Sequence, residues 1–199
     1  MRKSHLLMEK FNFYREKKFL EIGPAFEPHI KFVNLKYEEY HCIDLDNSYK
    51  IKKYYKEKFN NVKYKCYDGK KIPYPDNYFD RIIISHCLEH IINPENFINE
   101  MLRVIKKKRF ISIALPCDPG LLWRLGRFFL KMFFINKKNI NSRGKNLDHD
   151  YLIATEHVNS IFNLITILKK KFKISNEIYY PFNIGWADVN LFYICTIQK

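Results

Sequence analysis

Residues 72–90 read IPYPDNYFDRIIISHCLEH, a loop marked by two prolines that leads into an uninterrupted apolar run. The run at Arg81–Ser85 does not alternate between apolar and polar residues, so it predicts a strand buried on both faces of a parallel sheet. Pro94 then begins a predicted helix that continues through Arg103. The stretch therefore reads as one strand-loop-helix unit of an α/β fold.

The same alternation continues on both sides of this stretch. In chain order the sequence predicts helix 5–17, strand 18–23, helix 28–37, strand 40–44, helix 49–60, strands 62–67 and 110–115, a helix capped by Thr155 that ends at Lys169–Lys171, and strands 174–180 and 189–197. This pattern is typical of a doubly wound sheet, whose ligands bind beyond the carboxyl ends of the strands. We therefore expect functional residues just after Gly23, Asp44, Tyr67, Ser85 and Leu115.

Composition limits the class of protein. The chain has 199 residues, 47% hydrophobic and 28% charged, which suits one domain with a core and excludes wholesale disorder. No apolar run reaches the ~20 residues of a membrane span, and Leu6-Leu7-Met8 is too short for a secretory signal. The five cysteines are scattered and never spaced as CxxC, so we expect no metal site, no disulfide framework and a cytoplasmic location.

The net charge of +14 is typical of proteins that bind nucleic acid or anionic membranes, and equally of a solvated lysine surface. Where the basic residues lie distinguishes a binding surface from a solvated lysine surface better than the total charge does. Residues 119–147 contain seven basic residues and no acidic one, whereas the other lysines are spread along the chain. The question of an anionic partner therefore concerns that stretch.

Four motifs follow the predicted strands. Residues 20–24, Leu-Glu-Ile-Gly-Pro, lead into a loop where the backbone can approach a ligand closely. Asp44 comes 21 residues after Gly23, at the end of the second strand, where a carboxylate can accept hydrogen bonds from ribose hydroxyls. Asp68-Gly69 follows the third strand, and residues 85–90, Ser-His-Cys-Leu-Glu-His, end the fourth.

In this order and spacing the motifs resemble the class I methyltransferases that use S-adenosylmethionine, in particular the small-molecule branch called type 11. The resemblance rests on IPYPDNYFD at 72–80, CLEH at 87–90 and MLRVIK at 101–106, and it covers roughly residues 18–116. It implies a seven-stranded Rossmann-like methyltransferase sheet with a helical lid inserted after strand five. It also implies S-adenosylmethionine as the cofactor.

The resemblance assigns ten cofactor-binding residues. The loop after the first strand and the Ser85-His86 pair would contact the methionine end, Asp44 the ribose and Asp68 the adenine amino group. Taken alone, Asp44 also reads as an ordinary acid at a strand end. The ten residues are Glu21, Gly23, Pro24, Ala25, Asp44, Leu45, Asp68, Gly69, Ser85 and His86.

The loop departs from the family pattern at Ala25 and Glu27, where further glycines are usual. S-adenosylmethionine has no pyrophosphate and carries a positive sulfonium, so an acidic, glycine-poor loop harms its binding less than it harms NAD binding. The loop therefore argues against a nicotinamide-dependent dehydrogenase.

A hydroxyl acceptor would benefit from a general base, and the candidates follow the fifth strand. Asp118 comes immediately after it, and His149 and His157 lie further along the chain. In the first turn of a helix, His157 would have a lowered pKa and a neutral imidazole. A loop histidine satisfied by hydrogen bonds explains either histidine equally well.

Residues 120–136, GLLWRLGRFFLKMFFIN, predict a helix with an unusually wide apolar arc. Arg124, Arg127 and Lys131 form one narrow basic stripe, and three charges exclude a membrane span. We expect either a lid buried over the active site or a helix lying in a membrane interface, and we favour the lid.

The leading hypothesis is a cytoplasmic S-adenosylmethionine-dependent methyltransferase that methylates a small molecule or a sugar or glycan precursor at oxygen. Residues 115–124 and 156–164 resemble, more weakly, methyltransferases of cell-surface glycan biosynthesis. One alternative is an RNA methyltransferase that uses residues 106–109 and 124–145, although no Asn-Pro-Pro-Tyr run follows strand four. Another is a non-catalytic cofactor-binding module on the inner membrane face, which contacts the membrane through 120–136.

The whole chain is expected to be a single methyltransferase domain. Residues 1–116 would bind the cofactor, 117–155 would form the basic lid, and 156–199 would supply the last helix and strands.

Overall fold

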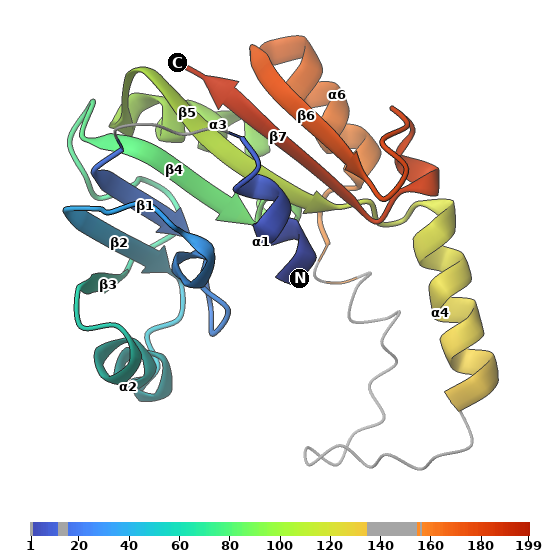
Figure 1. Cartoon of the computed structure of the whole chain (residues 1–199), viewed down its shortest axis with the longest axis horizontal. Helices are drawn as coiled ribbons and strands as arrows, with labels where there is room; N and C mark the ends of the chain where they lie inside the picture. Colours follow the sequence, from blue (N-terminus) through green and yellow to red (C-terminus); the bar gives the residue numbers. More distant parts are fainter. Residues whose placement is uncertain (1, 12–15, 135–154, 156) are drawn as a thin grey trace.

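The computed structural model describes residues 2–11, 16–134, 155 and 157–199, and it has a seven-stranded sheet in the order β3-β2-β1-β4-β5-β7-β6 (Figure 1). Neighbouring strands from β3 to β5 are parallel, and β7 runs antiparallel to both β5 and β6. This is the doubly wound, seven-stranded sheet that the sequence predicts. The strands are β1 (Lys18–Ile22), β2 (Glu39–Asp44), β3 (Val62–Cys66), β4 (Phe79–Ser85), β5 (Ile105–Pro116), β6 (Ile174–Tyr180) and β7 (Phe192–Gln198).

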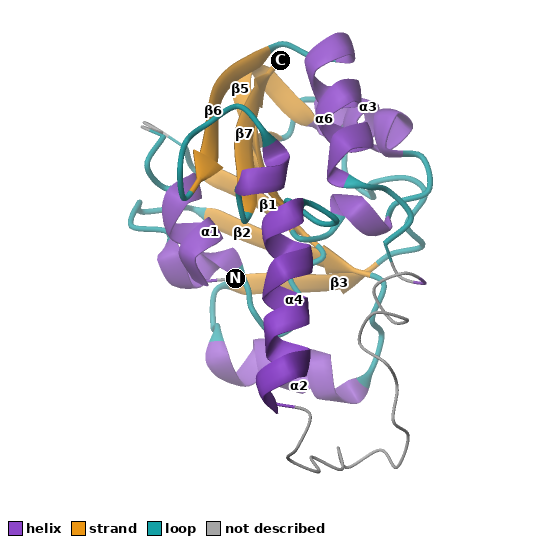
Figure 2. Ribbon diagram, turned by 90° about the vertical axis from the view of Figure 1, so that its right-hand side faces the viewer, coloured by secondary structure: helices purple, strands orange, loops and turns teal. Residues whose placement is uncertain are grey.

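Helices cover both faces of the sheet (Figure 2). Side chains of α1 and α2 belong to one apolar cluster, and those of α3 and α6 belong to the cluster on the opposite face. The α-helices are α1 (Arg2–Met8), α2 (Tyr49–Lys58), α3 (Pro94–Val104), α4 (Leu121–Phe134) and α6 (Ile161–Lys171), and the short 3-10 helices are η1 (His29–Phe32), η2 (Leu88–His90) and η3 (Ala187–Val189).

The central strand β4 explains the uninterrupted apolar run. Ile82 and Ile84 belong to the cluster on the α3 side, whereas Ile83 belongs to the cluster on the α1 side, and all three are fully buried. A strand covered on both faces has no solvent side on which polar residues could alternate.

Three predicted helix boundaries are wrong. α1 ends at Met8 and does not continue to residue 17, although 12–15 lie outside the described residues. The crossover at 28–37 contains only the single turn η1, which is tied to β1 by the hydrogen bond from the His29 N–H to the Glu21 carboxylate. α6 begins at Ile161, and its N-cap is Ser160, whose hydroxyl accepts a hydrogen bond from Asn163.

A buried ionic network joins α1 and the turn after it to the sheet. Arg81 is 0% exposed, and its guanidinium donates to the Glu9 carboxylate at 2.7 Å and to the Ser112 hydroxyl at 3.0 Å. His29 Nε2 lies 2.8 Å from the same Glu9 oxygen, and His29 Nδ1 lies 2.8 Å from Nδ1 of His5. Burial alone would raise the pKa of Glu9, but the hydrogen bond from His29 and the charge of Arg81 hold that pKa below its usual value.

We expect Glu9→Ala to lower the free energy of unfolding by about 3–5 kcal/mol, because it removes a carboxylate that accepts a hydrogen bond from the buried Arg81 guanidinium. Urea denaturation followed by circular dichroism measures this loss. Glu27→Ala is the matched control, since the Glu27 carboxylate forms an exposed pair with Lys31 and its removal should change stability by less than about 0.5 kcal/mol. A similar small loss for Glu9→Ala would contradict the prediction.

Candidate functional site

A cavity of about 540 Å³ opens at the carboxyl ends of β1, β2, β3 and β4, where the topology predicts a ligand. Its walls come from the loops after these strands and from the start of α3. Five of the ten predicted cofactor residues line it: Gly23, Asp44, Leu45, Asp68 and Gly69. The other five, Glu21, Pro24, Ala25, Ser85 and His86, are not among its lining residues.

At Gly23 the loop after β1 packs closely against Cys87. Its φ is +65°, its N–H donates to the Ile43 carbonyl at 2.9 Å, and a Cβ at this position would lie 2.6 Å from Sγ of Cys87. A side chain here would collide with the loop that follows β4. Glycine is therefore required both by the backbone conformation and by the packing.

The loop keeps a glycine-like shape at Ala25, one of the two positions that depart from the family pattern. Ala25 has a φ of +43°, its N–H donates to Asp44 Oδ2 at 3.0 Å, and its carbonyl accepts from the Tyr55 hydroxyl at 2.9 Å. These hydrogen bonds hold a left-handed residue that has a side chain. At the other position, Glu27 is exposed, pairs with Lys31 and does not line the cavity.

Glu21 supports the loop from beneath. Its carboxylate is buried and accepts hydrogen bonds from the His29 N–H at 2.6 Å and from the Tyr40 hydroxyl at 2.7 Å. Burial raises the pKa of Glu21 to about 7, although these hydrogen bonds act in the opposite direction. The structure thus shows Glu21 bonded within the fold, between the strand and the η1 turn.

Asp44 and Asp68 present carboxylates to the cavity. Asp44 is bonded to two backbone N–H groups, of Ala25 and Asp46, and each of its oxygens keeps further acceptor capacity. Asp68 is exposed, and the hydrogen bond from the Lys70 N–H lowers its pKa, so it is ionised at neutral pH. The cavity therefore has two anionic hydrogen-bond acceptors on adjacent strand ends.

Ser85 and His86 do not line the cavity, and His86 contacts α1 instead. His86 has a φ of +51°, its Nε2 lies 2.8 Å from the Ser4 hydroxyl of α1, and burial lowers its pKa to about 4. It is therefore neutral at pH 7. The Ser85 hydroxyl is buried and has no hydrogen-bond partner among the described residues.

Sequence reasoning missed most of the wall that comes from 87–100. Cys87 and His90 stand in the motif that identifies the fourth strand, so the motif itself was the available signal. The rest of this wall comes from the loop before α3 and from the first turns of α3, and the sequence indicated these residues only as part of a predicted helix. The lining residues that were not predicted are Tyr67, Lys70, Cys87, His90, Ile91, Ile92, Asn93, Asn96, Phe97 and Glu100.

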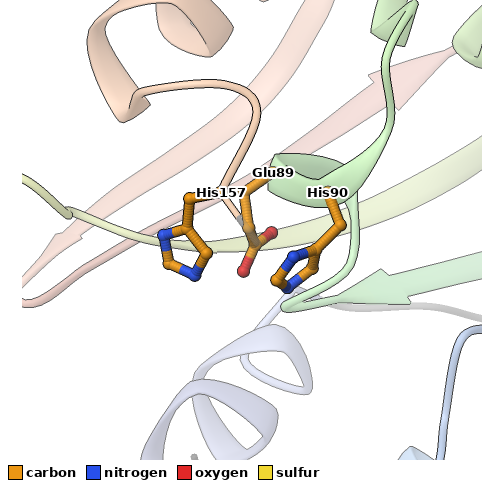
Figure 3. Close-up of side chains that lie close together, drawn as sticks. All are labelled: Glu89, His90 and His157. Atoms are coloured by element: carbon orange, nitrogen blue, oxygen red, sulfur yellow. The ribbon is translucent and has the colours of Figure 1, made fainter. Parts of the chain in front are cut away.

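A second polar cluster gathers two of the three predicted catalytic residues. Asp118 is 5% exposed, and its carboxylate accepts from Arg127 of α4 at 2.8 Å and lies 3.6 Å from Nδ1 of His157. His157 stands beside His90 and Glu89, which come from η2 (Figure 3). His149 lies outside the described residues.

The expected helix-dipole effect on His157 is wrong. The helix begins at Ile161, so His157 lies in the loop before the N-cap and not in a first turn. Glu89 is buried beside it, and burial raises the pKa of Glu89 to about 7.

α4 follows β5 as predicted, but most of the apolar side chains that the structure describes in this helix are exposed. The Leu121 N–H donates to Asp188 and the Trp123 indole donates to the Leu191 carbonyl, which anchors the first turn. Beyond that turn the helix projects away from the sheet (Figure 1). Leu125, Phe128, Phe129 and Met132 are each at least 41% exposed, so the described residues do not bury them as a lid.

Comparison with known proteins agrees with this geometry. Residues 20–113 match the family model described as a methyltransferase domain. The chain is 38% identical over 63 residues to the ubiquinone/menaquinone biosynthesis C-methyltransferase UbiE of Coxiella burnetii, and this match covers 32% of the chain and 25% of that protein. The chain thus spans about a quarter of the length of that curated relative.

Two solved structures share the fold over nearly the whole chain. The N-methyltransferase NodS of Bradyrhizobium japonicum, in complex with S-adenosyl-L-homocysteine, has a TM-score of 0.65 at 14% identity, over 100% of this chain and 86% of that one. The [4+2]-cyclase SpnF has a TM-score of 0.67 at 14% identity, over 99% of this chain and 80% of that one. At such identities the likeness concerns the fold.

Gly23→Ala should lower the free energy of unfolding by about 2–4 kcal/mol, since the new Cβ meets Cys87 and the φ is unfavourable for alanine. Introducing Cys87→Ala as well should recover about 1 kcal/mol, because it removes the closest contact atom. Urea denaturation of the wild type, the two single variants and the double variant measures the coupling energy between positions 23 and 87.

Gly126→Ala in α4 is the control for this cycle. Nothing lies within 4 Å of a Cβ at Gly126, so the substitution should be neutral or stabilising in a helix. If Gly23→Ala lowers the free energy of unfolding equally in the wild type and in Cys87→Ala, the contact between the new Cβ and Cys87 does not cause the loss.

Proposed function

The chain carries a class I S-adenosylmethionine-dependent methyltransferase domain of the type 11 branch at residues 20–113, and on that premise we propose that the protein methylates a small-molecule acceptor. One observation carries the proposal. The cavity lies at the carboxyl ends of the parallel strands, and the glycines and aspartates of the family motifs line it. The proposed acceptor class is a hydroxylated small molecule such as a sugar or glycan precursor, methylated at oxygen.

The residues of the cavity fit S-adenosylmethionine. This cofactor, when bound, supplies a methyl group activated by a positively charged sulfur. Asp44 would accept hydrogen bonds from the ribose hydroxyls, and Asp68 would accept one from the adenine amino group. Gly23 and Gly69 line the cavity without side chains, and a Cβ at either would press on another lining residue, Cys87 at 2.6 Å or Leu45 at 3.0 Å. A cavity of about 540 Å³ lies within the usual range for small-molecule sites.

The protein's own contribution would be to hold the acceptor against the cofactor. Fixing two reactants in attack geometry can supply about 7–11 kcal/mol of the barrier. Asp118 and His157 stand together beside η2, where an acceptor hydroxyl could lose its proton as the methyl group is added. We propose this side as the acceptor side, with His149 a further candidate base.

The position of the basic residues gives less support to an RNA acceptor. Lys106–Arg109 stand near the amino end of β5, where Lys106 and Arg109 contact Asp80. Arg109 and Pro116 are seven residue steps apart, which is ~23 Å along the strand, so this cluster lies at the opposite end of the strands from the cavity. An RNA backbone bound there would not lead into the proposed site.

Titration calorimetry with S-adenosylhomocysteine tests the cofactor site. We expect Asp44→Ala to weaken binding at least tenfold, because a hydrogen bond to a charged group contributes about 1.5–3 kcal/mol. Glu57→Ala removes the same charge from the exposed surface of α2 and should leave the affinity unchanged. Absence of binding by the wild-type chain would remove the proposed function, and equal binding by Asp44→Ala would remove the assignment of Asp44.

Turnover separates an enzyme from a non-catalytic module. Methyl transfer from labelled S-adenosylmethionine to a panel of hydroxylated sugars and phenols would support the proposal. Cofactor binding without transfer to any acceptor would favour the binding module.

The exposed face of α4 favours a second proposal, that this helix lies in an anionic membrane interface. Four large apolar side chains, Leu125, Phe128, Phe129 and Met132, are exposed together on α4, and the stretch 119–147 has no acidic residue to oppose binding. None of the described helices is both long enough and apolar enough to cross a bilayer. Contact through α4 would therefore be peripheral.

We expect a Phe128→Ser, Phe129→Ser double variant to bind phosphatidylglycerol vesicles at least tenfold more weakly than the wild type, because each buried Phe contributes about 1.5–3 kcal/mol. Vesicle sedimentation measures the affinity. Tyr49→Ser is the control, since Tyr49 is an even more exposed aromatic residue but lies on α2. Equal binding by the double variant, or no binding by the wild type, would overturn the membrane proposal.

A further inference from the structure

Three metal-ligating side chains converge on the proposed acceptor side. Glu89 and His90 come from η2 after β4, and His157 comes from the loop before α6 (Figure 3). One ligand atom from each lies within 4.8 Å of the others. A single ion can be reached from all three at such a spacing with small side-chain adjustments.

The two segments are held together independently of these side chains. The Asn159 N–H donates to the Glu89 carbonyl at 3.0 Å, and the Asn159 side chain donates to the Ile91 carbonyl at 2.6 Å. The loop that carries His157 is therefore fixed on η2 by Asn159. The backbone therefore brings the two segments that carry these side chains together.

Glu89 supplies an independent sign of a missing partner. The residue is 3% exposed, and its Oε2 has no hydrogen-bond partner among the described residues. A buried carboxylate oxygen without a partner is costly and needs an explanation, such as a bound ion. In Figure 3 the carboxylate lies between the two imidazole rings, where it could share a ligand with them.

His157 is oriented in the way that metal-binding histidines usually are. Its Nδ1 lies 3.6 Å from Oδ2 of Asp118, and its other ring nitrogen is turned toward Glu89 (Figure 3). Asp118 is itself held by Arg127 at 2.8 Å. A carboxylate behind a ligating histidine helps to orient the ring, so within the site proposed below Asp118 would be a positioning residue.

We propose that Glu89, His90 and His157 bind a divalent transition-metal ion and that, resting on the proposed function, this ion takes the acceptor hydroxyl as a further ligand. Two imidazoles and one carboxylate suit Zn²⁺, Fe²⁺ or Co²⁺ and leave coordination positions open. A bound divalent ion lowers the pKa of a hydroxyl that it ligates. The O–H bond then breaks with its electron pair left on oxygen, and the proton passes to solvent water.

A metal site at these residues and simple base catalysis by His157 can be distinguished by experiment. A base needs only Asp118 behind it and no ion, whereas the metal site needs Glu89 as well. The two alternatives therefore differ in the effect of Glu89→Gln and in the effect of a chelator.

Cobalt titration of the chelator-treated full-length chain tests the site. We expect one equivalent of Co²⁺ to bind with visible absorption bands, and Zn²⁺ to displace it. Glu89→Gln and His157→Asn should each weaken Co²⁺ binding at least a hundredfold, and Asp118→Asn should weaken it about 10- to 100-fold. Glu95→Gln, a substitution at an exposed residue of the adjacent helix α3, should leave the affinity unchanged.

Two further measurements keep the outcomes separate. Stoichiometric Zn²⁺ should raise the melting temperature of the wild type and not that of His157→Asn, which covers the case in which Glu89→Gln fails to fold. S-adenosylhomocysteine titration of the same samples tests the proposed function separately. Cofactor binding without stoichiometric metal binding would overturn the metal site alone, as would metal binding that both ligand variants retain.

Discussion

Parallel pairing on both sides of β4 is the constraint on which the rest of this structure depends. β1 and β5 flank β4 in the same direction, so the loops after β1, β4 and β5 open at one edge of the sheet. Because helices cover both faces, the central strand is uniformly apolar, and polar residues are displaced to the strand ends. The chemistry of the chain is therefore concentrated at one edge.

Arg81 is buried within this apolar strand, and its charge needs an anionic partner, which the N-terminal segment supplies. Glu9 neutralises the guanidinium, and His29 and His5 extend the hydrogen-bonded chain to α1 and η1. The crossover after β1 is reduced to one 3-10 turn, and α1 helps to cover that face of the sheet. The hydrogen bonds thus link the first nine residues of the chain to η1 and to β4.

The turn η2 is where the two halves of the proposed site meet. Cys87, just before it, packs against Gly23 on the cofactor side. Glu89 and His90, within it, face His157 on the acceptor side. A change in this turn would therefore alter both the cofactor cavity and the proposed metal site.

The sequence by itself determined the strand-helix alternation, the motif order and the need for glycine at position 23, because periodicity and turn chemistry are encoded by neighbouring residues. Only the tertiary structure decided that α6 begins after Ser160, that the crossover keeps a single turn, and that α4 leaves Phe128 and Phe129 exposed. Cysteine spacing predicted no metal site, but spacing carries no information about His157, which lies 67 residues after His90. Such contacts depend on how distant segments pack, which no local pattern records.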